Sequence, residues 1–273
     1  MPRIELSHNH HQFNRSFIMK RAFDFKVASL STLVGVILVL LMVWLTGNEF
    51  GTPVFPFMAI LSAYIIAGMV TALVSKGDTI AEPGVAAVIT GFVTYFFITS
   101  MEFHAFDKLS AEVLRVNLIL LTLNGILLSL VGAWAGEKFQ LTFEKEGDGK
   151  EPIVEWAWIA AGTIFGVTVS IFLSNLIIKL FGLTLSPLYI SLAIGIFITG
   201  WVVGLRSPGE TLPEAGIAGV LTAIINLDIF KFTLDPDTTS LTTLAVLGSV
   251  VIGLVAGLIG GAAGEKMQEA EEA

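Results

Sequence analysis

Two short polar motifs carry the side chains best suited to chemistry in this sequence. Thr79 and Glu82 precede one apolar run, and Thr211 and Glu214 precede another. Two carboxylates at matching positions could gate a pathway or bind a cation. The Thr-x-x-Glu spacing is also that of a capping box, in which the Thr hydroxyl and the Glu carboxylate satisfy free N–H groups of the first helical turn. Capping is the favoured interpretation, because a helix start uses these residue types at this spacing whatever the protein does.

One further charged residue interrupts an apolar run. Asp228 stands three residues before Lys231, towards the end of that run. An ionisable side chain inside a membrane is a functional candidate by default. At the level of the lipid headgroups, the same carboxylate would be an ordinary surface charge. Asp228 therefore joins the four motif residues as a candidate position.

The sequence offers no other constellation for catalysis or cofactor binding. It contains no cysteine, which excludes disulfides and thiolate metal sites. His8, His10 and His11 lie close together near the N-terminus, but without a fixed fourth ligand they do not predict a zinc site. Patterns for a phosphate-binding loop, a serine nucleophile and a zinc protease are missing. We therefore predict no enzymatic activity, no cofactor and no metal.

The elements that must position the candidate residues are membrane spans. Of the 273 residues 54% are hydrophobic and 14% are charged, and the mean hydropathy is +0.82. A soluble domain carries about 25% charged residues, which cover its surface. Runs of about 20 apolar residues match the hydrocarbon thickness of a bilayer. We predict an all-α, polytopic membrane protein with eight transmembrane helices, at 27–47, 56–75, 82–101, 116–136, 156–178, 187–205, 213–232 and 242–264.

An internal repeat relates the first four spans to the last four. Segment 77–86 matches 209–218 at an offset of 132 residues, and segment 132–140 matches 260–268 at an offset of 128. Weaker matches earlier in each half, such as Gly35 with Gly166 and Pro56 with Pro187, fit an offset of 131. The repeat predicts a gene duplication. It also supports the seventh span, which is doubtful alone because only 13 residues, 215–227, precede Asp228.

The repeat and the charges together predict a topology. Of the 15 Lys and Arg residues, 11 fall on one side of the predicted spans and four on the other, and the richer side is cytoplasmic. Both termini are then cytoplasmic in the cell membrane. Four spans per copy give the copies the same orientation, with a pseudo-twofold axis along the membrane normal. The predicted divisions are an N-terminal tail (1–26), the first repeat (27–140), a charged linker (141–155), the second repeat (156–268) and an acidic tail (269–273).

Two further features concern packing and loops. Glycines recur at four-residue spacing, which lets helix backbones approach closely in lipid. We expect them to pack helices within the chain; the alternative is a face for self-association. The last span has small residues on more than one face and could pack on two neighbours. The outer loop 101–116 is expected to form a short amphipathic helix at the interface. The predicted packing residues are Gly132, Gly136, Gly200, Gly204, Gly253, Gly257, Gly261 and Gly264.

The glycine pattern resembles a known group of proteins. Ile66-Ala67-Gly68, a short turn, the segment Gly84 to Gly91, and then Gly125, Gly132 and Gly136 are similar to small four-helix membrane proteins of archaea and Gram-positive bacteria whose activity is uncharacterised. The resemblance covers each half separately, and implies that the chain is a fused tandem pair. It implies no activity and assigns no functional residue.

Two function classes follow from these observations. The favoured prediction is a structural or accessory membrane subunit, because the spans hold few charges and many glycine seams. Its partners would be the lipid bilayer and either other membrane subunits or further copies of itself. The alternative is a passive transporter, channel or lipid-handling protein with a pathway at the interface between the repeats. Nucleic acid is excluded as a partner, because the net charge is −8 and no basic face is present.

Overall fold

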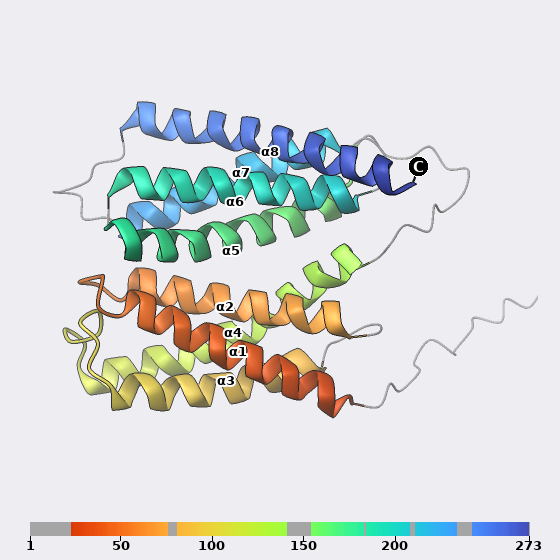
Figure 1. The fold of residues 1–273 in the computed structure, drawn as a ribbon. Helices are drawn as coiled ribbons and strands as arrows, with labels where there is room; N and C mark the ends of the chain where they lie inside the picture. Colours follow the sequence, from red (N-terminus) through yellow and green to blue (C-terminus); the bar gives the residue numbers. More distant parts are fainter. Residues whose placement is uncertain are drawn as a thin grey trace, which may run out of the picture.

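The described residues of the computed structural model form long helices (Figure 1). These residues are 23–75, 81–140, 154–182, 184–207, 211–233 and 242–272. Within them eight helices are long and apolar enough to cross a membrane, and no strand is present. The chain is therefore an all-α, polytopic membrane protein. The helices are α1 (Phe25–Thr46), α2 (Val54–Val74), α3 (Ala81–Ser100), α4 (Ala111–Gln140), α5 (Trp156–Phe181), α6 (Leu185–Arg206), α7 (Leu212–Thr233) and α8 (Thr243–Glu272).

The seventh helix continues through the charged residue that made it doubtful. α7 has 22 residues and passes Asp228 without a break. The apolar and aromatic residues after Asp228, which are Ile229, Phe230 and Phe232, keep the segment Leu212–Phe232 apolar enough to cross a membrane. α7 is thus long enough to span a bilayer at 1.5 Å per residue.

The loop between α3 and α4 differs from its prediction. The segment 104–108 consists of turns, and α4 begins at Ala111, so no separate amphipathic helix forms. Phe103 and Phe106 are buried, and the Ala105 N–H donates to the Gly47 carbonyl at 2.9 Å. The two aromatic rings pack against the ends of α1 and α2 instead of lipid, which fixes the loop as a compact cap.

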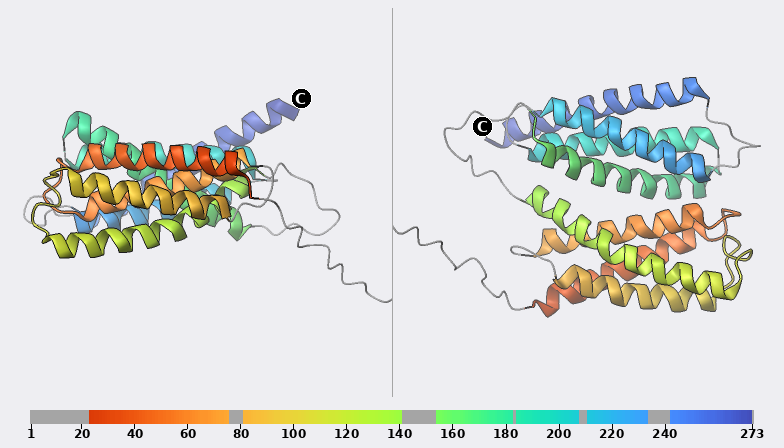
Figure 2. Two further views of the ribbon diagram at one scale, coloured as in Figure 1. Left: turned by 90° about the horizontal axis from the view of Figure 1, so that it is seen from below. Right: turned by 180° about the vertical axis from the view of Figure 1, so that it is seen from behind.

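The helices fall into two four-helix units, α1–α4 and α5–α8, which Figure 1 and the rear view in Figure 2 show as two layers. The same pairs pack in both units: the first helix with the second and third, and the fourth with the second and third. α1 begins and α8 ends at the same end of the molecule, here called the inner end, and the opposite end is the outer end. α1 and α5 both run from the inner to the outer end, so the two units have the same orientation.

The contacts between the units are not reciprocal. α5 packs against α1, α2 and α4, α7 packs against α2, and α6 touches α4. A twofold axis would pair each of these contacts with its mate, so that α1 would also touch α6 and α8. Among the described helices those mates do not occur, and α3 and α8 lie at opposite margins of the molecule (Figure 1). The predicted pseudo-twofold axis is therefore wrong, because a different face of each unit enters the interface.

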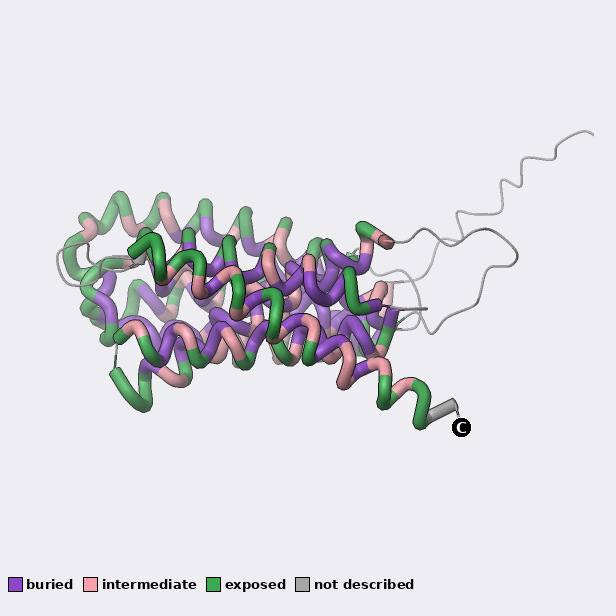
Figure 3. The backbone as a smooth tube through the Cα atoms, turned by 90° about the horizontal axis from the view of Figure 1, so that it is seen from above, coloured by how far each residue is buried: buried purple, intermediate pink, exposed green. Residues whose placement is uncertain are grey.

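Apolar side chains fill most of the interface between the units, where the buried Asn175 of α5 is a polar exception that contacts the Met42 sulfur at 3.5 Å. Figure 3 shows that buried positions gather inside the bundle while exposed positions line its outside. Three clusters of buried residues cross the interface. From the inner to the outer end they pair Met69, Ala135 and Phe139 with Trp158 and Ala161, then Val39 and Met42 with Ile171, and then Phe50 and Phe55 with Ile178, Leu188 and Phe230.

Glycines bring the second and fourth helices of each unit into backbone contact. A Cβ atom at Gly132 would overlap the Ile65 carbonyl, and one at Gly136 would crowd the Met69 carbonyl. In α8, a Cβ atom at Gly260 would overlap the Phe197 carbonyl. The backbone of α8 therefore contacts that of α6 as the backbone of α4 contacts that of α2. These contacts explain why the residues are glycines: any side chain would separate the helices.

The other predicted packing glycines also face neighbouring helices. Gly200 and Gly204 of α6 lie against the carbonyls of Gly257 and Gly261 of α8, and Gly264 lies against that of Trp201. A second face of α8, with Gly253, Gly257 and Gly261, lies against α7 at Gly219 and Ala215. α8 thus packs on α6 and α7 at once.

Candidate functional site

The candidate carboxylate of the first unit links two helix starts. Glu82 lies in the first turn of α3 and is only 4% exposed. Its Oε1 accepts a hydrogen bond of 3.0 Å from the backbone N–H of Asp24. Asp24 is the N-cap of α1, and its own carboxylate accepts from the N–H groups of Lys26 and Val27. Glu82 therefore holds the start of α1 against the start of α3.

The candidate carboxylate of the second unit makes the corresponding bond. Glu214 lies in the first turn of α7, is also 4% exposed, and accepts from the backbone N–H of Glu155 at 2.9 Å. Glu155 is the N-cap residue of α5. The second oxygen of Glu214, Oε2, is buried without a hydrogen-bond partner. Each acid is thus bonded to a helix start of its own unit, and neither acid bonds to the other unit among the described contacts.

The predicted capping box is wrong for the second unit. The N–H and the hydroxyl of Thr211 both donate to Oε1 of Glu265 in α8, at 2.6 and 2.7 Å. The carboxylate that satisfies Thr211 therefore comes from a neighbouring helix, and Glu214 is free to reach α5. Thr79, the counterpart of Thr211, lies outside the described residues.

Glu265 is not among the site residues predicted from the sequence. Its signal was present, because Glu265 and Glu137 are matching members of the repeated 132–140 block. Asp24 and Glu155 were missed as well. Their backbone N–H groups are the partners of the buried acids, and a backbone donor leaves no signature in residue type.

Asp228 lies apart from this inner-end network. It is exposed near the outer end of α7, as is Lys231 one turn later. No ion pair joins these two residues in the described part of the chain, where the ion pairs are Lys179 with Glu49 and His104 with Asp107. The position of Asp228 corresponds to the surface-charge interpretation.

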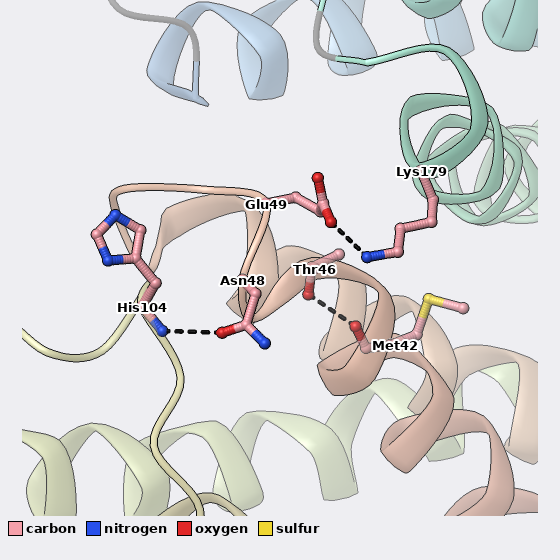
Figure 4. A network of polar contacts seen from close by, with 6 residues as sticks. All are labelled: Met42, Thr46, Asn48, Glu49, His104 and Lys179. Carbon is pink, nitrogen blue, oxygen red and sulfur yellow. Dashed lines mark hydrogen bonds and ion pairs between the residues drawn. The ribbon is translucent and has the colours of Figure 1, made fainter.

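A polar network at the outer end connects the two units (Figure 4). Lys179 of α5 forms an ion pair with Glu49, which follows α1, and its ammonium group lies 5.6 Å from the centre of the Trp44 ring. The backbone N–H of His104 donates to Oδ1 of Asn48 at 3.2 Å, which ties the α3–α4 loop to the same turn. The contacts of Lys179 fasten α5 to the first unit at the outer end.

Buried polar side chains line the interior of the second unit. A Cβ atom at Gly166 would crowd the hydroxyls of Thr199 and Thr222, and one at Gly195 would crowd that of Ser170. Some of the polar atoms find no partner among the described residues, and in the first unit the corresponding group is the Tyr64 hydroxyl alone. Those of the second unit are Thr163 Oγ1, Ser170 Oγ, Asn175 Oδ1, Tyr189 OH, Glu214 Oε2, Thr222 Oγ1 and Asn226 Oδ1.

The carboxylates of the site hold neighbouring helix ends together. Among the residues that the structure describes, no three His, Asp or Glu side chains gather as a metal-binding group. Carboxylates in the network accept from backbone N–H groups of neighbouring helices, which is the chemistry that closes helix ends. No family model, curated protein or solved structure matches this chain.

Proposed function

We propose that this protein is a structural or accessory subunit of the cell membrane, built by duplication of a four-helix unit. The observation that carries the proposal is the combination of glycine seams within the units and a largely apolar interface between them. Helices in lipid gain little from burying apolar surface, so such close backbone contact is a packing device. A chain whose polar groups mainly hold helix ends together is suited to a structural role in a membrane complex.

Matching contacts at the predicted counterparts support duplication. The Glu82 bond to Asp24 has its counterpart in the Glu214 bond to Glu155. In the same way, the contact of Gly132 with α2 has its counterpart in that of Gly260 with α6. Unrelated halves of glycine-rich composition would not place equivalent side chains on equivalent partners.

The proposed topology places the inner end, with both termini, in the cytoplasm. It follows from the excess of Lys and Arg on that side. The chain has no cysteine, so single cysteines at Ala270 and Gly51, which are both exposed, would report the two faces to a membrane-impermeant reagent in whole cells. Labelling of position 51 alone supports the topology, and labelling of position 270 alone reverses it.

The first functional test is flux through the purified chain. Liposomes containing the unsubstituted protein should be no more permeable to protons, alkali cations and small neutral solutes than empty liposomes. E82Q and E214Q retain an acceptor oxygen, so each should remain folded with a modest loss of thermal stability. A measurable flux that either substitution abolishes, with the melting temperature unchanged, would remove the structural proposal.

A passage within the second unit is the second candidate function. The unpartnered hydroxyls of Ser170 and Thr222, which lie among α5, α6 and α7, favour it over a pathway between the units, where apolar clusters fill most of the space. Polar atoms without partners are expensive inside a membrane and are often functional. If liposomes do leak a small neutral solute, S170V should block the leak. The matched change V39S, at the counterpart position of the first unit, should not alter it.

A further inference from the structure

We infer that copies of this chain assemble head to tail. The exposed face of α1, with Leu30 and Leu33, packs in one copy against the exposed face of α6 and α8 in the next copy. The inference rests on the proposed duplication. If the two units are copies of each other, the contact between them within one chain is a template for a contact between two chains.

The template is the way in which the first unit receives α5. Met69 of α2 and Phe139 of α4 are 5% and 6% exposed, because Trp158 and Ala161 of α5 cover them. The Phe139 ring lies 5.9 Å from the Trp158 ring, centre to centre. α2 and α4 thus form an acceptor face, and α5 presents the inserting face.

The second unit repeats the acceptor face without a cover. The counterparts of Met69 and Phe139, at offsets of 132 and 128, are Trp201 of α6 and Met267 of α8. Met267 is 46% exposed and Trp201 is half-buried, and the indole Nε1–H donates to the Met267 sulfur at 3.2 Å. Beside them, Phe197 is exposed where its counterpart Ile65 borders the interface cluster.

The first unit repeats part of the inserting face without an acceptor; the counterpart of Trp158 is Val27, which is 8% exposed, and the repeated part follows it along α1. Ala161 and Ile164 of α5 pack against the first unit, and Ala161 is fully buried. Their counterparts in α1, at an offset of 131, are Leu30 and Leu33, which are 40% and 57% exposed. Ile37 continues this exposed apolar stripe one turn further along α1.

The backbone beneath the two acceptor faces has the same shape. Gly132 and Gly136 set the approach of α4 to α2, and Gly260 and Gly264 set the approach of α8 to α6. Shape matters here because lipid competes with protein for an apolar face, so that close fit decides association in a membrane. A surface whose equivalent fits a helix of this same chain is suited to a second copy.

Because the contact between the units is not reciprocal, the same contact can be repeated between chains. A twofold contact would use up both matching faces within one chain. A head-to-tail contact leaves one inserting face and one acceptor face free, and repeating its rotation adds copies into a ring where the rotation closes and into an open filament where it does not. The other available cover for both faces is lipid, which the experiment must separate from protein.

Cross-linking between copies tests the inference in native membranes. The chain has no cysteine, so L30C and M267C can be introduced one at a time. Co-expressed and oxidised, the two variants should form a disulfide-linked pair of chains. The matched control is V85C with M267C, because Val85 is also exposed and lies near the inner end, but on α3. A yield for L30C no higher than for V85C would overturn the inference and indicate lipid-covered faces.

A second measurement avoids any substitution at the faces. The unsubstituted chain, labelled at its C-terminus, should bleach in two or more steps per particle in liposomes at low protein density. Uniform single steps would overturn the assembly, as would cross-links from L30C to a different membrane protein only. If impermeant reagents found positions 30 and 267 on opposite faces of the membrane, the proposed duplication and topology would fail together with the assembly.

Discussion

The two units share their seams and differ in their interiors. In the first, Val39 and Ile60 are fully buried apolar residues. Their counterparts in the second unit are Ser170 and Ser191, which are also fully buried. The glycines that set the helix spacing stand at matching positions in both. Backbone contact therefore fixes the architecture of both units, and the side chains inside the two units differ.

The divergence is one-sided in its polarity. Unpartnered buried polar atoms are concentrated in the second unit. At three of the counterpart positions the first unit has the apolar residues Val39, Trp44 and Met58, and at the other four it has polar residues. Burying a polar atom without a partner costs free energy. The second unit bears that cost, so any activity beyond packing is expected there. Substitutions at the matching positions of the first unit are the controls.

The largest effects should come from the shared seams. G132A and G260A each place a Cβ atom onto a backbone carbonyl of the neighbouring helix. Overpacking of this kind costs about 1–3 kcal/mol, and both variants should lose thermal stability in mild detergent to a similar extent. The matched control is G248A in α8, because a Cβ atom there meets no atom within 4 Å. A seam that tolerated alanine in one unit alone would break the comparison.

The buried acids should follow, with effects again paired between the units. E82A and E214A each leave a backbone N–H of a helix start without its acceptor, and a buried unsatisfied donor costs about 1–3 kcal/mol. The glutamine variants keep an oxygen at the same place and should lose less than about 1 kcal/mol. Chemical denaturation of the four variants checks this. A stable E214A beside an unstable E82A would show that Glu214 is not held there for packing.

The sequence predicted the helices well because each span is a long apolar run with glycines at fixed spacing. The same pattern placed Gly132 and Gly260 at helix contacts. It could not assign the partners of Glu82 and Glu214, since those partners are backbone N–H groups 58 and 59 residues away. The Thr-x-x-Glu spacing suggested a local cap, but a carboxylate that lies close to another helix start satisfies that donor instead.

The arrangement of the units was also beyond the repeat pattern. Duplication predicts that two units have similar structures, but it leaves open which faces meet. That choice depends on the side chains outside the repeated motifs. Trp158 of α5 fills the face between α2 and α4, and at its counterpart position α1 has the smaller Val27. The twofold expectation failed because a different face of each unit enters the interface.

A smaller effect should separate the two interiors. Ser170 Oγ has no partner, so S170A removes an unsatisfied group and should stabilise the protein by up to about 1 kcal/mol. Ser174 shares a hydrogen bond of 2.6 Å with Ser191, so S174A should cost about 1 kcal/mol. Melting temperatures of the two variants, measured side by side, give opposite signs. A destabilising S170A would mean that its hydroxyl has a partner in the membrane, such as a bound water.

The smallest effect should come from the surface bond that joins the units. Lys179 and Glu49 are about one-third exposed, with side-chain exposures of 34% and 32%. Exposed ion pairs contribute about 0–1 kcal/mol and weaken with salt. E49Q should therefore lower stability slightly at low ionic strength and leave it unchanged at high ionic strength. D107N is the matched control, because Asp107 pairs with His104 inside one loop and not between units. A loss as large as that of G260A would mean that the outer ion pair, and not the apolar clusters, holds α5 to the first unit.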